Sequence, residues 1–319
     1  MHIETCIGPG DPRPLRRSAT HIAARMPQTP DFSDVQTLLL EPEPSLRLVR
    51  SSLAAIGFRR IVKGDPATPD LATLELTAFD LILVHATTEE TAGFELIQRI
   101  RNRRFRTNPF VCAMITTWEP KPALIARAGS AGADGVLAKP FSMTSIRDVV
   151  AKFVEQPRPW IAAPGYVGPD RRRDRGMGPD DPVVEVPSTL RMKATGQPVG
   201  DVAEQIDRAW EAVAVLRLDR TARVAGEILR RARAEPEADG TGEALLRLIG
   251  TMEEVAQRSG ATDDPRTTRI AGEIAAILRD ALRAPRRLAS SLSACITLAD
   301  LLGAVARTPR AAPAEAGAA

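Results

Sequence analysis

Between Val35 and Gln156, apolar runs typical of buried strands alternate with amphipathic runs typical of helices. The strand-like runs are VQTLLLEP (35–42), RRIVKGD (59–65), FDLILVHA (79–86), FVCAMITT (110–117) and DGVLAKP (134–140). A run with helical spacing of its apolar residues follows each of them: 44–58, 70–78, 91–102, 123–133 and 142–156. Five consecutive strand–helix units predict an α/β domain with a doubly wound parallel sheet and helices on both faces.

The rest of the chain divides by composition into four further segments. Residues 1–33 lack periodicity, which predicts a flexible extension before a domain at 34–156. Residues 157–198 are rich in Pro, Gly and Arg and predict a linker arm. Helical periodicity resumes over 199–306, and the Ala- and Pro-rich residues 307–319 are expected to be a disordered tail.

The helical segment predicts a small all-α domain of about five helices. Val202, Ile206, Trp210 and Val213 recur at steps of four and three residues. All three histidines, His2, His21 and His85, precede this segment, so it cannot carry a phosphohistidine. Dimerisation or docking is compatible with such a bundle, and a homo-oligomer through it is one expectation.

Charge and cysteine content exclude several classes of protein. The net charge of +3 arises from 43 basic and 40 acidic residues, which gives no warrant for binding DNA. The three cysteines are far apart and form no C-x-x-C pair, so neither a zinc site nor a disulfide framework is expected. Because no run approaches about 18 consecutive apolar residues, we expect no membrane span and a cytoplasmic protein.

Four motifs in the α/β segment resemble the receiver domains of bacterial two-component response regulators, chemotaxis regulators included. They are LLLEPEPSLR, FDLILVHATTEETAGFEL, MITTW and AGADGVLAKPF, in that order along the chain. The resemblance implies a five-stranded sheet of order 2-1-3-4-5. It also implies transfer of a phosphoryl group from a kinase phosphohistidine to an aspartate, assisted by Mg²⁺, a Lys and a Thr or Ser.

The residues at the implied phosphoacceptor site depart from that family pattern. His85 stands at the position of the aspartate, and Pro42 replaces one member of the acidic pair that Glu41 retains. Thr116 and Lys139 match the other two roles. One carboxylate is a poor ligand set for Mg²⁺, so we expect weak or absent magnesium, no other cofactor and no catalytic residue. Lys139 should keep the His85 imidazole neutral.

The predicted function is therefore that of a pseudo-receiver, a non-enzymatic protein of two-component (phosphorelay) signal transduction that acts by protein–protein interaction. Val136 stands where receivers usually carry an aromatic residue that reports phosphorylation, which agrees with this interpretation. In receivers the last helix, strand and helix form the usual face for partners, here within 123–154. Expected partners are other signalling proteins, such as a kinase or a flagellar or chemotaxis component. Phosphorylation of His85 itself ranks last.

A second hypothesis concerns the linker arm. The run YVGPDRRRDRGMGP places Arg171, Arg172, Arg173 and Arg175 after Tyr166, which suits phosphate contact and base stacking. Arg-rich tails on some receiver-like proteins bind cyclic di-GMP, so a nucleotide effector is the alternative function. Interleaved aspartates nearly cancel the charge, which favours a solvated linker.

Overall fold

The computed structural model describes residues 30–171, 182–198, 200–258, 265–284 and 287–308. Its first half is a parallel sheet made of β1 (Gln36–Leu40), β2 (Arg60–Gly64), β3 (Leu81–His85), β4 (Cys112–Thr117) and β5 (Gly135–Ala138). The order in the sheet is β2-β1-β3-β4-β5. The intervening helices are α1 (Glu43–Ala55), α2 (Leu71–Leu76), α3 (Ala92–Arg101), α4 (Pro122–Ala131) and α5 (Met143–Glu155). The predicted fold class and strand order are confirmed.

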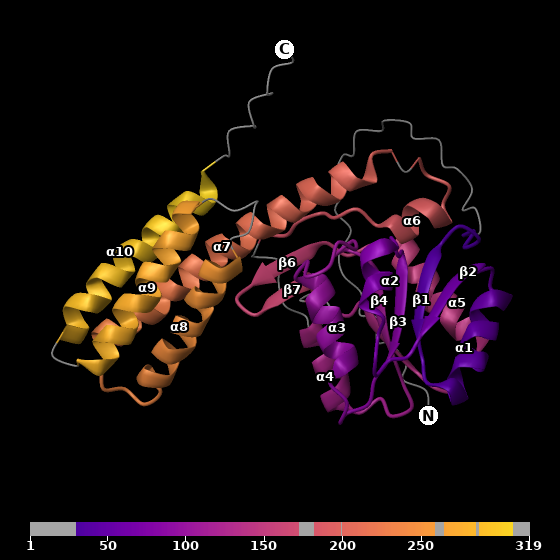
Figure 1. Ribbon diagram of the computed structural model, residues 1–319, viewed down its shortest axis with the longest axis horizontal. Coiled ribbons are helices and arrows are strands. Elements are labelled where there is room, and N and C mark those ends of the chain that lie inside the picture. Colours follow the sequence, from indigo (N-terminus) through magenta and orange to yellow (C-terminus); the bar gives the residue numbers. More distant parts are fainter. Residues whose placement is uncertain (1–29, 172–181, 199, 259–264, 285–286, 309–319) are drawn as a thin grey trace, which may run out of the picture.

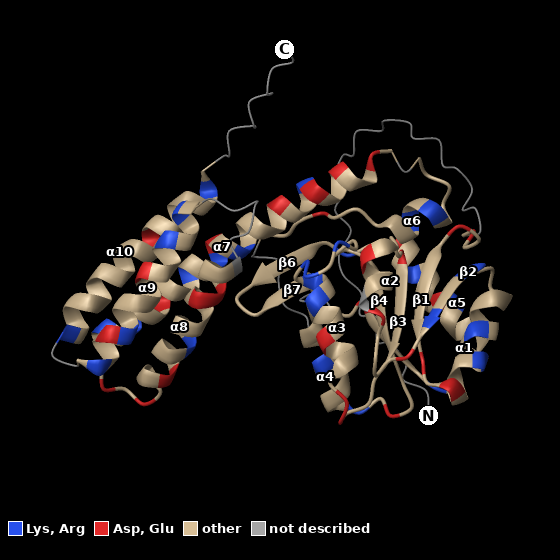
Figure 2. Ribbon diagram, in the orientation of Figure 1, with Lys and Arg blue, Asp and Glu red and all other residues tan. Residues whose placement is uncertain are grey.

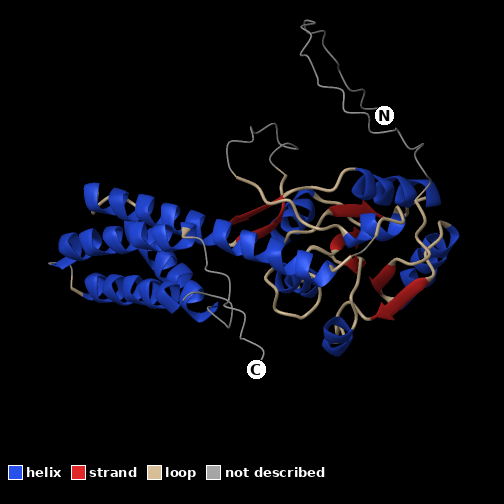
Figure 3. Ribbon diagram, turned by 90° about the horizontal axis from the view of Figure 1, so that it is seen from above, coloured by secondary structure: helices blue, strands red, loops and turns tan. Residues whose placement is uncertain are grey.

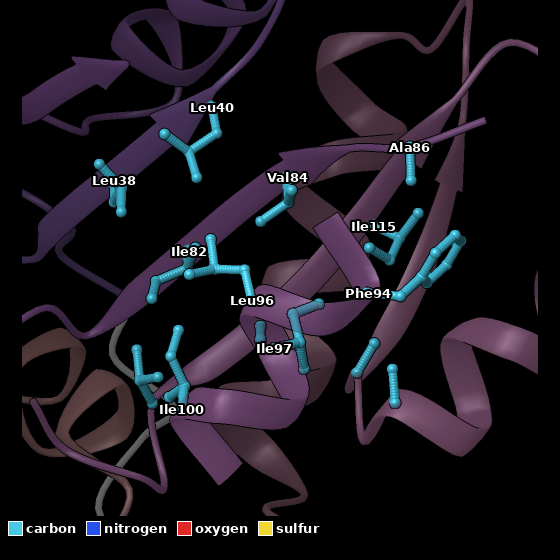
Figure 4. Close-up of a cluster of buried hydrophobic side chains, with 14 of the residues drawn as sticks. Leu38, Leu40, Ile82, Val84, Ala86, Phe94, Leu96, Ile97, Ile100 and Ile115 are labelled. Carbon is cyan, nitrogen blue, oxygen red and sulfur yellow. The ribbon is translucent and has the colours of Figure 1, made fainter. Parts of the chain in front are cut away.

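Both faces of the sheet are covered, because successive residues of each strand point to opposite sides. On one face, Leu38, Ile82 and Val84 pack against α3 residues such as Ile97 (Figure 4). On the other face, Leu39, Leu83 and Met114 pack against α1 and α5. The central strand β3 is buried along its whole length, which explains its uninterrupted apolar sequence.

The expected flexible extension enters the core at its last residues. Phe32 is 3% exposed and stacks on Phe58, with ring centroids 4.6 Å apart. The aromatic ring at position 32 therefore belongs to the core beside α1 and α5. Residues 1–29 lie outside the described residues.

The predicted linker arm over 157–198 contains secondary structure in its described parts. Strands β6 (Trp160–Ala163) and β7 (Tyr166–Pro169) form an antiparallel hairpin, and Val184 adds a bridge to Trp160. Helix α6 (Thr189–Ala194) follows and buries Leu190 against the core shared with α5. Short strands rich in Pro and Gly have no clear period, so their burial against the α/β domain could not be read from the pattern alone.

Four helices make up the helical region within the described residues, rather than about five. They are α7 (Val202–Ala234), α8 (Thr241–Arg258), α9 (Pro265–Arg283) and α10 (Leu288–Arg307). The run that begins at Val202 and a second periodic run at 221–234 join in α7, because no proline interrupts its 33 residues. Helices α8, α9 and α10 pack with the C-terminal part of α7 around one core, seen as the all-helical end of Figure 3.

Helix α7 connects the bundle to the α/β domain (Figure 1). Its N-terminal half packs Val213 and Trp210 against Phe110 and against Trp160 of the hairpin. The hairpin in turn contacts the turns that precede β4 and β5, at the amino edge of the sheet. The opposite, carboxyl edge stays clear of these elements.

Candidate functional site

Four predicted site residues meet in one buried cluster of directly contacting side chains at the carboxyl edge of the sheet, which is called the pocket below. Glu41 follows β1, His85 ends β3, Thr116 lies in β4 and Lys139 follows β5. The register pairs His85 with Thr116 across neighbouring strands. Exposed fractions run from 0% for Thr116 to 8% for His85. Parallel strands that end at the same edge bring these side chains together, as the family pattern implied.

The Glu41 carboxylate is occupied by donors from three other elements. Its Oε2 accepts from Ser45 Oγ at 2.6 Å and from Lys139 Nζ at 2.5 Å, and its Oε1 accepts from Thr116 Oγ1. Both members of the Lys139–Glu41 ion pair have side chains at most 1% exposed. Removing one member would leave an uncompensated charge in the interior. The ammonium of Lys139 thus supplies the positive charge that balances this carboxylate.

His85 faces the same lysine. Its Nδ1 lies 3.1 Å from Lys139 Nζ and 3.2 Å from the carbonyl oxygen of Thr116, which already accepts from Ala86 N at 3.0 Å. An ammonium has only donors, so a hydrogen bond from Lys139 requires an unprotonated Nδ1, whereas a hydrogen bond to the carbonyl oxygen of Thr116 requires a proton on Nδ1. Burial and the charge of Lys139 lower the pKa of His85, against a smaller raising effect of Glu41. The predicted neutral imidazole agrees with this geometry.

Lys139 is held from several sides. Burial lowers its pKa, while the hydrogen bond to Glu41 and its charge raise it. The Nζ atom also lies 5.6 Å from the ring centroid of Trp118, a cation–π arrangement. This lysine therefore points inward at Glu41 and His85, with an indole above it.

Pro42 leaves this pocket without a second carboxylate. It forms the N-cap of α1 with an extended backbone and no side-chain hydrogen bond. Among the described residues, no group of three or more His, Cys, Asp or Glu side chains could hold a metal ion. Mg²⁺ prefers octahedral oxygen ligands, and the one carboxylate present already receives three hydrogen bonds. The residues at this site do not fit a bound magnesium ion.

Arg171 is the one described arginine of the predicted nucleotide contact. It helps to hold the hairpin against the α/β domain. It donates to the carbonyl oxygen of Ala133 and lies against Gly129 of α4. Tyr166 donates to the carbonyl oxygen of Pro169, and burial raises its pKa. Arg172, Arg173 and Arg175 lie outside the described residues. Within the described part, the run that starts at Tyr166 is explained by contacts with the α/β domain.

Ser45 and Trp118 belong to the pocket but were not predicted from the sequence. Ser45 is 2% exposed and lies one turn into α1, where it reaches back to Glu41. A serine among the apolar positions of a helix is a weak signal for such a contact. Trp118 follows β4 and is 51% exposed, and its position directly after a buried strand was the only available signal.

Helix α10 is long and apolar enough, by length and composition, to cross a membrane. About one third of this helix is buried in the protein. We expected no candidate span because no long run of consecutive apolar residues occurs. Helix α10 reaches a high average hydropathy although Ser and Thr interrupt its apolar residues. Leu292, Cys295 and Leu302 of this helix are fully buried in the bundle core. A helix that packs one side into a bundle core can meet the same criterion of length and composition.

Comparison with known proteins gives relatives for the N-terminal part. Chemotaxis protein CheY of Pseudomonas aeruginosa is 25% identical over 111 residues, 34% of this chain and 87% of that protein. Sensor histidine kinase AruS of the same species is 27% identical over 147 residues, 46% of this chain but only 15% of the kinase. The CheY-like receiver domain protein of Methanospirillum hungatei has 19% identity, covering 37% of this chain and 93% of its own, with a TM-score of 0.32. No protein-family model matches.

The strand order, the pocket and these relatives define the N-terminal part of the chain as a response-regulator receiver domain. Within that class it is CheY-like. The C-terminal helical region is unrecognised. A receiver-like fold supports a role in two-component signalling.

Proposed function

We propose that this chain is a two-component signalling protein whose receiver domain acts by binding other proteins and does not accept a phosphoryl group. One observation carries the proposal: the Glu41 carboxylate is saturated by Ser45, Thr116 and Lys139, beside an imidazole in the acceptor position. A phosphoryl acceptor in such a site requires a free carboxylate and a bound cation. This arrangement supports the absence of both.

The proposal extends to magnesium and to catalysis. A divalent cation at Glu41 would have to displace the Lys139 ammonium from a distance of 2.5 Å and find its other ligands in water. Magnesium binding is therefore weak or absent, and the protein is not an enzyme. Buried polar groups that satisfy one another also hold strands together, so Thr116 and Lys139 have a structural role here.

His85 is a poor phosphoryl acceptor in this geometry. A nucleophilic imidazole attacks through an accessible, unprotonated nitrogen. The Nδ1 atom of His85 lies inside the pocket, 3.1 Å from the Lys139 ammonium and 3.2 Å from the carbonyl oxygen of Thr116, so it is not open to a phosphodonor. A phosphorelay through this residue would require the lysine and the ring to separate first.

Partners in this proposal are cytoplasmic signalling proteins, a kinase or a chemotaxis component among them. The relatives support a signalling context, since one is a chemotaxis protein and another a sensor histidine kinase. Binding between proteins requires complementary shape and charge and no chemical step at the pocket.

Incubation with acetyl phosphate and MgCl₂ tests the loss of phosphorylation. Intact-mass analysis is expected to show no added phosphoryl group, either as a hydroxylamine-sensitive acyl phosphate or as an acid-labile phosphohistidine. The His85→Ala variant serves as the control for the imidazole. A stoichiometric acyl phosphate on the wild-type protein would overturn the proposal, and so would a phosphohistidine that disappears in His85→Ala.

A further inference from the structure

The carboxyl-edge loops expose large apolar side chains beside the blocked pocket. Trp118, directly after β4, is 51% exposed, and Met143, at the start of α5, is 53% exposed. Pro120 and Pro140 are also exposed in the same two loops. Tryptophan is enriched among the residues that dominate binding energy at protein interfaces. This surface therefore has Trp118 as an anchor side chain, and the prolines restrict the backbone of the loops around it.

The same edge is acidic. Exposed glutamates follow β1, β3 and β4, namely Glu43, Glu89, Glu90 and Glu119. Lys121 pairs with Glu119 at 2.6 Å, and Arg127 donates to the carbonyl oxygen of Thr88 in the loop after β3. The four carboxylates at this edge therefore outnumber the two nearby cations. Figure 2 shows acidic segments in the loops at the end of the sheet opposite α6 and α7. The buried charges of Lys139 and Glu41 neutralise each other and leave this surface potential unchanged.

We propose that this surface, the loops after β1, β3, β4 and β5, docks a basic polypeptide segment of a partner that carries an apolar anchor residue. The exposed glutamates attract and orient the basic segment, and its apolar residue packs on Trp118. Nucleic acids and anionic lipid surfaces are repelled by the same charges. The inference rests on the proposed function and specifies the chemistry of the partner.

The geometry of Lys139 makes Trp118 available for this contact. With the ammonium below the ring at 5.6 Å, the indole rests on the pocket and leaves half of its surface to solvent. Since the lysine is committed to Glu41, no charge from the pocket competes with the partner's cations. The buried contacts of Lys139 with Glu41 and His85 thus support the docking surface from below.

A fluorescein-labelled peptide with the repeat Leu-Lys-Lys-Leu, followed by anisotropy on the full-length protein, tests the proposal. A matched peptide with Glu for Lys is the control ligand. Trp118→Ala is expected to weaken binding about tenfold or more. The double variant Glu89→Gln with Glu90→Gln, whose side chains are exposed, is expected to weaken it and to reduce its salt dependence.

Matched control variants lie near the other edge of the sheet. Leu76 is 86% exposed at the end of α2, and Glu155 is exposed at the end of α5. Leu76→Ala and Glu155→Gln should bind the lysine peptide like the wild type. Absence of binding at physiological salt would overturn the inference, as would binding that the two carboxyl-edge variants do not weaken. Either outcome, with no phosphorylation by acetyl phosphate, would leave the proposed function in place and remove only the docking surface.

Discussion

In the pocket, the carboxylate of Glu41 is the common partner of three donors. Ser45 comes from the first turn of α1, Thr116 from β4 and Lys139 from the end of β5. A buried ion pair of this kind adds little net stability relative to apolar residues of similar size. Removal of one partner alone, however, strongly destabilises the fold because the other charge stays buried. The role we infer for Glu41 is therefore structural, in place of cation binding.

Replacing Glu41 by Gln should destabilise the protein by about 3 kcal/mol, because the Lys139 ammonium would remain buried without a counter-charge. Urea denaturation at neutral pH measures the change. The matched control is Glu43→Gln at an exposed position two residues away, which should change the free energy of unfolding by less than about 0.5 kcal/mol. Equal effects of the two substitutions would contradict the structural role.

His85 should make the protein less stable in mild acid. Its folded-state pKa lies below the ordinary value of 6.5, so the unfolded chain binds more protons as the pH falls below 6.5. The stability present above that pH is lost as the pH falls toward the folded-state pKa, by at most about 1.4 kcal/mol per pH unit. His85→Asn, which can still accept from Lys139 but does not titrate, should lose less stability between pH 7.5 and pH 5.5, roughly the range over which histidine titrates. The same loss in both proteins would contradict this assignment.

Among the elements, the hairpin β6–β7 packs against both α7 and the receiver domain. Arg101, 1% exposed at the end of α3, donates to the carbonyl oxygens of Gly132, Pro109 and Val111 and to Asp134. Its guanidinium lies 4.9 Å from the ring centroid of Trp160 in β6. Gly132, with φ of 85°, lets the backbone of β7 approach. The amino edge of the sheet is therefore covered by specific contacts with the hairpin, whereas the carboxyl edge is not.

Gly168→Ala should weaken that contact by about 1–3 kcal/mol. A Cβ at position 168 would lie 2.8 Å from the Tyr166 hydroxyl and 3.1 Å from the Cα of Gly132, so the strand would have to shift. Thermal or urea denaturation reports the loss. Gly250→Ala in α8, where a Cβ meets nothing within 4 Å, should instead stabilise the protein by about 0.5–1 kcal/mol. A neutral result at Gly168 would show that the hairpin is loosely held.

The periodic spacing of apolar residues predicted the receiver helices and strands, because this signal is local in the sequence. The family motifs predicted four pocket residues. Glu41, His85, Thr116 and Lys139 each stand at the end of a strand-like run, and the topology then brings them together. The hairpin and the contact of Ser45 depend on long-range packing, which leaves no period in the sequence. The indole of Trp118 shows the same limit, since its place over Lys139 follows from two strands pairing.

At the scale of the molecule, α7 joins two separate cores. Its first half completes the small core around Phe110 and Trp160, and its second half completes the bundle. An ion pair between Arg103, which lies after α3, and Asp207 of α7 supports the junction, and so does the hydrogen bond that Arg217 of α7 donates to Asn102. The bundle is thus mounted at the amino edge of the sheet, and the carboxyl edge stays open to partners.

The buried face of α10 gives a stability test of its place in the bundle. Leu302 is fully buried, whereas the neighbouring Leu301 is 49% exposed. Leu302→Ala should cost about 2–5 kcal/mol in aqueous buffer, and Leu301→Ala less than about 0.5 kcal/mol. Calorimetric or urea unfolding without detergent measures both. Similar small effects of the two substitutions would contradict a core role for this helix.

The most direct test of the blocked pocket is a magnesium titration of the full-length protein by isothermal calorimetry. The double variant Pro42→Asp with His85→Asp restores the two carboxylates that the receiver pattern carries, and it provides the matched comparison. We predict no saturable heat for the wild-type protein at millimolar Mg²⁺ and a saturable site in the double variant. Saturable binding by the wild type that Glu41→Gln abolishes would contradict the account.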